Sequence, residues 1–283
     1  MQILDGKNFA AEYRLKLAEK VKKLKEESGV VPGLAVVIIG EDPASQIYVR
    51  NKMKACEAAG IKSFNVVLPE TVSQSEAERE VKNLAENSEV DGIIVQLPLP
   101  KRFDEKRILS LIPVEKDVDG LSGENLGRLL KGEDSLISCT PYGIIELLKG
   151  YGVTFSGKNA VVIGRSNMVG KPIAALLLRE NATVTVCHSK TENIKNYTKN
   201  ADILVAAIGK AKFVTADMVK KGAVVVDVGI NRIDGKIYGD VDYENVKDLC
   251  SFITPVPGGV GPMTVTMLLQ NTFNACVKNR KNG

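Results

Sequence analysis

The sequence predicts an α/β fold of two domains, each a mostly parallel sheet flanked by helices, with the second domain Rossmann-like. Apolar runs typical of buried strands alternate with stretches of helical periodicity, an order that favours parallel sheets covered by helices. The alternation stops at a polar, glycine-rich stretch around residues 120–132 and then starts again. At 283 residues the chain is also longer than a single hydrophobic core usually supports.

The first half of the chain is expected to alternate helices and strands, beginning with a helix. Within residues 8–28 apolar side chains recur at steps of three and four, which predicts a helix. A continuous apolar run at 34–39 and a β-rich run at 64–68 predict two strands with a helix between them. The pattern Ser73-Gln-Ser-Glu76 is typical of a capping box and predicts the start of another helix. A third strand is expected at residues 92–97.

The second half shows the same alternation. Strands are predicted at four further stretches rich in β-branched and apolar residues, 159–163, 183–187, 202–206 and 222–227. We expect the first domain to cover residues 1–138 and the second to cover 139–262. A C-terminal helix of about residues 263–283 is expected to pack back on the first domain.

Composition and charge exclude several classes of protein. The net charge is only +4 from 38 basic and 34 acidic residues, without a long basic block, so no nucleic-acid partner is expected. The five cysteines are odd in number and lack Cys-x-x-Cys spacing, which argues against a disulfide framework or a zinc site and favours the cytoplasm. Neither a signal peptide nor an apolar run of about 18 residues is present, so no membrane association is expected.

A glycine-containing loop opens the second domain. Residues 164–172 lie between a predicted strand and a helical run, where free backbone N–H groups and the helix dipole suit a phosphate. The spacing departs from Gly-x-Gly-x-x-Gly, so an ordinary tight turn is the alternative. An NAD enzyme usually has an acidic residue after the next strand, whereas this chain has Ser189 there and Arg165 in the loop. Together they predict NADP.

Three polar side chains of the first domain share one predicted helix face. Ser45, Tyr48 and Lys52 are spaced by three and four residues. Burial beside an aromatic ring would lower the pKa of the lysine and let it exchange protons near neutrality. The alternative is an ordinary exposed lysine. Gln96 ends a predicted strand at the edge where ligands gather, and it is a candidate partner for Lys52.

Two further segments admit both a structural and a functional interpretation. Asp117-Val-Asp119-Gly120 suits a turn, but its acids also suit recognition of a nitrogen-rich ring. Residues 255–262, rich in Pro and Gly, predict an irregular loop that either ends structural elements or lets a flat ligand approach the backbone. The single histidine, His188, cannot complete a metal site from imidazoles, and no metal is expected.

Five ordered motifs together resemble the bifunctional methylenetetrahydrofolate dehydrogenase/cyclohydrolase family. The resemblance extends from Asp5-Gly6-Lys7 to the terminal helix. The motifs are Tyr48-Val-Arg-Asn-Lys52, Val95-Gln-Leu-Pro-Leu99, Lys116-Asp-Val-Asp-Gly120, Gly164-Arg-Ser166 and Pro255-Val-Pro-Gly-Gly-Val-Gly-Pro-Met-Thr264.

The resemblance implies roles for residues of both domains. In the first domain it implies that Lys52 is the central catalytic residue, Tyr48 shapes the folate pocket, Gln96 tunes the lysine and Asp119 holds the pterin ring. In the second domain it implies an NADP site. Its residues would be Gly164, Arg165, Ser166 and Ser189 at the phosphates and ribose, with Ile230 and Thr140 near the nicotinamide.

The resemblance also implies an activity. It implies NADP-dependent oxidation of methylene-tetrahydrofolate in a cleft between the domains, followed by hydrolysis of the methenyl product to formyl-tetrahydrofolate, and a homodimer paired through the nucleotide domain. Three alternatives stay open: a dehydrogenase without useful cyclohydrolase activity, an amino-acid or shikimate-type dehydrogenase, and a non-catalytic NADP sensor.

Overall fold

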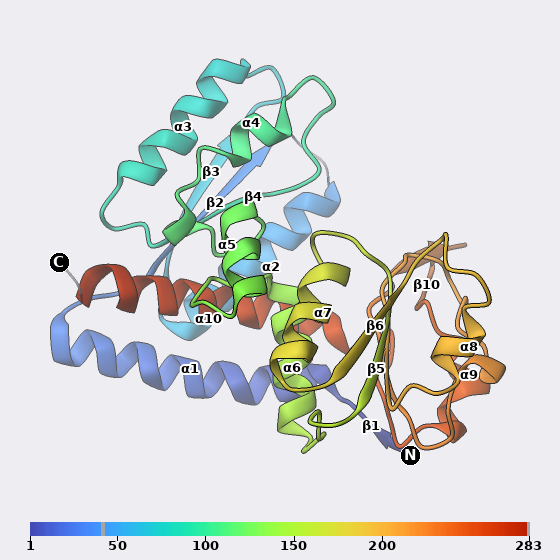
Figure 1. The fold of residues 1–283 in the computed structure, drawn as a ribbon. Helices are drawn as coiled ribbons and strands as arrows, with labels where there is room; N and C mark the ends of the chain where they lie inside the picture. The colour runs from blue at the N-terminus through green and yellow to red at the C-terminus, as the bar shows by residue number, and fades with distance from the viewer. Residues whose placement is uncertain (41–42, 282–283) are drawn as a thin grey trace. The chain divides into compact units, whose positions relative to one another are not determined.

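The computed structural model describes residues 1–40 and 43–281, without the side chains of residues 43–45, 47, 48 and 281 (Figure 1). The chain divides into two compact units. The six-stranded unit comprises residues 1–11, 129–133 and 140–264. The three-stranded unit comprises residues 12–128, 134–139 and 265–283.

The sheet of the three-stranded unit is wholly parallel, with the order β3-β2-β4. Its strands are β2 (Gly33–Ile39), β3 (Lys62–Leu68) and β4 (Gly92–Val95). Every residue of the central strand β2 is buried, as expected for an apolar run between two parallel neighbours. The three predicted strands are therefore confirmed, although β4 ends at Val95 rather than at Leu97. Gln96 follows β4 directly, and its N–H donates to Val37 O at 2.8 Å.

Several helices lie wholly or mainly in this unit. They are α1 (Gly6–Ser28), α2 (Pro43–Ala59), α3 (Gln74–Glu86), α4 (Glu105–Leu109), α5 (Gly123–Lys131) and α10 (Val260–Lys281), with a short 3₁₀ turn η1 (Val114–Lys116). Apolar side chains of α3 and α4 pack on β2 and β4 around Val37, Val81 and Ile108. Helix α2 packs against β2 and β3. This packing holds α2 against the sheet to which β4 also belongs.

The predicted capping box at the start of α3 is present. The Glu76 N–H donates to Ser73 Oγ at 3.2 Å, and the Ser73 N–H donates to Glu76 Oε2 at 3.0 Å. This capping box could be recognised in the sequence because both partners lie within one helical turn.

The six-stranded unit contains a second wholly parallel sheet, with the order β1-β11-β8-β7-β5-β6. Its strands are β1 (Gln2–Ile3), β5 (Asn159–Ile163), β6 (Thr183–Cys187), β7 (Ile203–Ala206), β8 (Val224–Asp227) and β11 (Phe252–Ile253). The four predicted strands are confirmed. Strands β1 and β11 and the antiparallel hairpin β9 (Asn231–Ile233) and β10 (Lys236–Tyr238) are too short to show periodicity in the sequence.

Helices and 3₁₀ turns connect these strands. They are α6 (Cys139–Gly150), α7 (Gly170–Arg179), α8 (Lys195–Thr198), η2 (Ala216–Met218), α9 (Tyr243–Val246) and η3 (Lys247–Leu249). Helix α7 packs against β5 and β6 (Figure 1). The strand order changes direction at β5, which has β6 on one side and β7 on the other. Such a switch point is where Rossmann-like sheets bind nucleotides.

The predicted loop at residues 255–262 is shorter than expected. Helix α10 begins at Val260, so Gly261 and Pro262 lie in its first turn. Proline is tolerated there because the first helical N–H groups have no partner within the helix. Among the described residues, no helix is long and apolar enough to cross a membrane.

Candidate functional site

The loop after β5 folds tightly against its neighbours. Gly164 has φ +124°, and a Cβ there would collide with the carbonyl group of Ala207 after β7. A Cβ at Gly170, the first residue of α7, would likewise collide with the carbonyl group of Gly164. Glycine is therefore required at both ends of the loop. Without these two side chains, the backbone of the loop can lie close to the switch point.

Two predicted ligand residues lie on this loop. Ser166 Oγ accepts the N–H of Val169 at 3.2 Å and of Gly170 at 3.3 Å, so its hydroxyl lies at the start of α7. Arg165 is exposed, and its guanidinium is accessible to a charged ligand. Exposed Arg165 and Ser166 beside a helix start suit the phosphates of a dinucleotide.

A pocket of about 430 Å³ lies at the carboxyl ends of β5, β6 and β7. It is lined by Ile163, His188, Ser189, Thr191, Ile194, Ile208, Lys210 and Phe213. Apolar walls with a few polar groups suit a flat base and its ribose. The pocket includes the predicted Ser189. Sequence reasoning missed Lys210 and Phe213, which follow β7 in a segment without a recognisable motif.

The two residues predicted for the nicotinamide end do not line this pocket. The hydroxyls of Thr140 and Thr264 lie 2.9 Å apart and are half-buried. Ile230 follows β8, and its side chain is 57% exposed, which is unusual for an isoleucine and leaves an apolar surface available to a ligand. Both residues belong to the six-stranded unit, together with the phosphate loop.

In the three-stranded unit, Lys52 and Gln96 are direct partners. Lys52 Nζ donates to Gln96 Oε1 at 3.0 Å, from helix α2 to the end of β4. The amide nitrogen of Gln96 donates to Leu97 O at 2.8 Å, which fixes the oxygen toward the lysine. The pair that the sequence suggested is thus present. Ser45 and Tyr48 also lie in α2, but their side chains are outside the described part of the structure.

Charge and burial act on Lys52 in opposite directions. Burial lowers the pKa of Lys52, while the nearby carboxyl of Asp119 acts to raise it. Burial also raises the pKa of Asp119, against the effect of Lys52. The pKa of the buried Cys139 thiol lies well above its ordinary value for the same reason, desolvation, so this thiol stays protonated. An amine of lowered pKa in a partly dry site is suited to proton transfer.

The two acids of the predicted turn have different surroundings. Asp117 is buried, and its carboxylate accepts N–H bonds from Leu121 at 3.2 Å, from Ser122 at 2.8 Å and from the Asn125 side chain at 3.0 Å. Both acids line a pocket of about 270 Å³ near α4 and α5, but Asp119 is only half-buried, and among the described residues no hydrogen bond from its own turn occupies its carboxylate. Asp117 therefore holds the turn, and Asp119 is the acid available to a ligand.

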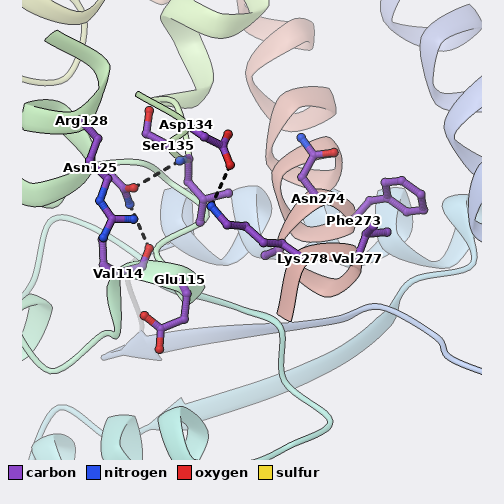
Figure 2. A pocket seen from close by; sticks show the side chains of 12 residues that line it. Val114, Glu115, Asn125, Arg128, Asp134, Ser135, Phe273, Asn274, Val277 and Lys278 are labelled. Atoms are coloured by element: carbon purple, nitrogen blue, oxygen red, sulfur yellow. Dashed lines mark hydrogen bonds and ion pairs between the residues drawn. The ribbon is translucent and has the colours of Figure 1, made fainter. Parts of the chain in front are cut away.

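Another pocket, of about 410 Å³, contains none of the predicted residues (Figure 2). Its polar groups largely satisfy one another. Lys278 Nζ pairs with Asp134 at 2.7 Å, and Asn125 bonds to Val114 O at 3.0 Å and to the Leu136 N–H at 3.2 Å. Its charges are mixed in sign, so no particular ligand is favoured. No cluster of three potential metal ligands occurs among the residues that the structure describes.

Comparison with known families agrees with this geometry. Residues 4–119 match the tetrahydrofolate dehydrogenase/cyclohydrolase catalytic domain, and residues 138–280 match the NAD(P)-binding domain of the same family. The chain belongs to the tetrahydrofolate dehydrogenase/cyclohydrolase family. The resemblance seen in the sequence motifs is therefore confirmed, as is the two-domain α/β fold.

Family members with similar chains include bacterial and eukaryotic proteins. Bifunctional protein FolD of Campylobacter hominis is 57% identical over 281 residues, which cover 99% of this chain and 98% of the relative. The crystal structure of the bifunctional FolD of Campylobacter jejuni matches with a TM-score of 0.95 and 48% identity, covering 99% of each chain. The family member from Trypanosoma brucei, solved with NADP cofactor and inhibitor, matches with a TM-score of 0.91 and 40% identity, covering 98% of this chain and 97% of that one.

Proposed function

We propose that this chain oxidises methylene-tetrahydrofolate with NADP and hydrolyses the methenyl product to formyl-tetrahydrofolate. Both family domains match in the expected order, and the hydrogen bond from Lys52 to Gln96 is the observation that supports hydrolysis most directly. Membership of the family sets aside a shikimate-type or amino-acid dehydrogenase. A non-catalytic NADP sensor would leave the half-buried Lys52–Gln96 pair without a purpose.

In the proposed hydrolytic step Lys52 accepts and donates protons. Water adds to the methenyl carbon and loses a proton, and one carbon–nitrogen bond then breaks as that nitrogen gains a proton, which leaves the formyl group. The lowered pKa of Lys52 suits both transfers. Gln96 fixes the amine, Asp119 holds the pterin ring, and Tyr48 shapes the folate pocket in this proposal.

In the proposed oxidative step the chain binds and orients the dinucleotide. Gly164, Arg165, Ser166 and Ser189 would hold its phosphates and ribose, with Thr140 and Ile230 at the nicotinamide end. When bound, NADP supplies the hydride acceptor. The apolar pocket and the exposed arginine of the six-stranded unit fit such a ligand. Hydride transfer requires orientation more than acid–base help, so no further catalytic group is needed there.

We further propose the domain division predicted from the sequence, a homodimeric state and a cytoplasmic location. Residues 1–138 would form the folate-binding domain, with the helix at 263–283 packing back on it, and residues 139–262 the NADP-binding domain. A dimer through the nucleotide domain is supported by edge strand β6, where the side chain of Val186 is 38% exposed. Five free, buried cysteines suit a reducing compartment.

The decisive experiment is an absorbance time course with methylene-tetrahydrofolate and NADP, with acid quenching to separate NADPH from the methenyl compound. We expect NADPH with little methenyl accumulation, and accelerated hydrolysis of added methenyl-tetrahydrofolate. NADPH with a persistent methenyl signal would identify a dehydrogenase alone. Absence of any reaction would contradict the proposed substrate.

A further inference from the structure

A buried carboxylate closes the loop that follows β7. Asp240 is fully buried, and its oxygens accept the N–H groups of three successive residues: Ile208 at 2.7 Å, Gly209 at 3.0 Å and Lys210 at 2.8 Å. Successive backbone N–H groups of this kind form a concave site for an anion. Here a side chain of the same chain fills that site, so the carboxylate determines the shape of the loop.

The same carboxylate also fixes a second loop. The side-chain amide of Asn231 donates to Asp240 Oδ1 at 3.0 Å and to Tyr238 O at 3.2 Å. Asn231 comes directly after Ile230, in the segment that follows β8. Ile208 and Lys210, on the first loop, line the pocket at the switch point. Asp240 therefore connects the loops after two neighbouring strands on the side where the nucleotide pocket opens.

A second buried acid holds Asp240 in place. Asp227, at the end of β8, is 3% exposed, and its carboxylate accepts the N–H groups of Gly229 at 3.0 Å, Asp240 at 2.8 Å and Val241 at 2.9 Å. A Cβ at Gly229 would collide with the carboxylate of Asp240, and one at Gly239 with that of Asp227. The surrounding backbone is thus closely fitted to the two acids.

Such an arrangement is costly if its only purpose is stability. Two neighbouring carboxylates are both removed from solvent, which costs free energy. Burial raises the pKa of Asp227 to about 6, although the three N–H groups that donate to its carboxylate act to lower this pKa. Apolar residues of similar volume usually stabilise a fold at least as well as buried charges do. Fixed acceptor geometry is what the carboxylates add, because each can receive several N–H groups at once.

We propose that Asp240, held by Asp227, is a positioning residue that preforms the NADP pocket by fixing the loops that contain Lys210 and Ile230. This inference rests on the proposed NADP-dependent function. It assigns Asp240 no contact with the reacting atoms. Its effect on the cofactor passes through the backbone of the two loops.

The test uses the full chain with the substitution Asp240→Asn. The amide keeps the shape of the side chain, but either orientation points an NH₂ group at two N–H donors. We expect the Kd for NADP, measured by calorimetric titration, to rise at least tenfold. The KM for methylene-tetrahydrofolate and the rate of hydrolysis of added methenyl-tetrahydrofolate should change less than twofold. The matched control is Asp234→Asn, which removes the same charge from the exposed β9–β10 turn, where φ is +49°, a conformation that asparagine tolerates.

A milder variant keeps the proposal testable if Asp240→Asn does not fold. Asn231→Ala leaves both acids in place and removes only the side-chain hydrogen bonds from Asn231 to Asp240 and Tyr238. We therefore expect the Kd for NADP to rise at least threefold. Unchanged NADP binding in this variant, or parallel loss of NADP binding and hydrolysis in Asp240→Asn, would overturn the proposal. Because calorimetry needs no turnover, failure of the proposed oxidation would be seen separately, as NADP binding without NADPH formation.

Discussion

Lys52 shows how a few contacts change the chemistry of a common side chain. It is only half-buried, yet it has a defined acceptor in Gln96 and a carboxyl group nearby in Asp119. Burial favours the neutral amine, and Asp119 limits this effect by favouring the charged form. The balance keeps the amine able both to take up and to release a proton.

Replacing Lys52 by Gln should remove the proton carrier while keeping a polar side chain. General acid–base catalysis typically contributes about 10²- to 10⁴-fold, so the rate of methenyl hydrolysis should fall by that order. The Kd for NADP should change little, because the phosphate loop belongs to the other unit. The control is Lys54→Gln on the exposed side of α2. Unchanged hydrolysis in Lys52→Gln would remove Lys52 from the mechanism.

The lowered pKa of Lys52 also predicts a pH dependence. As pH rises, the neutral amine forms earlier than in an ordinary lysine, whose pKa is 10.5. The enzymatic part of methenyl hydrolysis should therefore increase with pH, with a midpoint below that value, after the uncatalysed rate is subtracted. Lys52→Arg should lose this rise because its guanidinium stays charged. The same profile in both proteins would show that another group titrates.

Arg165 is predicted to discriminate between the two nicotinamide cofactors. Only NADP has a 2′-phosphate, and a hydrogen bond to a charged group contributes about 1.5–3 kcal/mol. Arg165→Ala should therefore weaken NADP binding by roughly ten- to a hundredfold while affecting NAD far less. Titration of both cofactors measures this, with Arg179→Ala at the far end of α7 as the control. Equal weakening of both cofactors would contradict the assignment.

Secondary-structure elements place these residues through contacts between distant parts of the chain. The buried amide of Asn271, on α10, donates to Val118 O and to Ile137 O, both at 2.8 Å. A Cβ at Gly120, whose φ is +68°, would collide with the backbone at Ser138. The turn that contains Asp119 is thus fastened to another segment of the same unit by the C-terminal helix.

The start of α3 allows a prediction about stability alone. Ser73→Ala removes the side-chain acceptor of the capping box, and loss of such an N-cap costs about 1 kcal/mol. Denaturant unfolding should show this decrease, whereas both activities should remain because α3 contains no proposed site residue. Ser88→Ala, at an exposed position beyond the end of α3, should leave the unfolding free energy unchanged. Similar losses in both variants would mean that the capping contact is not the cause.

At the scale of the whole molecule, the proposed functions are divided between two units with separate sheets. Lys52, Gln96 and Asp119 belong to the three-stranded unit, and the proposed phosphate loop and nucleotide pocket belong to the six-stranded unit. Hydrolysis of added methenyl-tetrahydrofolate and binding of NADP can therefore be altered independently, whereas oxidation needs the ligands of both units.

Ligand binding should reveal this division directly. At a concentration of 100 Kd, NADP should stabilise the state that binds it by about 2.7 kcal/mol. Hydrogen exchange should slow in the loops at 164–170, 188–191 and 207–213, and should change little at 117–121 when folate is absent. Arg165→Ala should reduce the protection at a fixed NADP concentration. Protection confined to the three-stranded unit would contradict the proposed NADP site.

Features that depend on neighbours along the chain could be predicted from the amino-acid sequence. Apolar runs located β2 and β5 because parallel strands buried on both faces need no polar alternation. The capping box at Ser73 was readable within one turn, and the ordered motifs identified the family. The partnership of Lys52 with Gln96 was inferred from two separate motifs, one on a helix face and one at a strand end.

Contacts between residues far apart in the chain became evident in the three-dimensional structure. The structure distinguishes the half-buried Asp119 from the buried Asp117, whose carboxylate is occupied by N–H groups of its own turn. It added Lys210 to the nucleotide pocket and brought Asp240 to the loop after β7. These contacts depend on strand order and on the close approach of backbones, and neither leaves a periodic signal in the sequence.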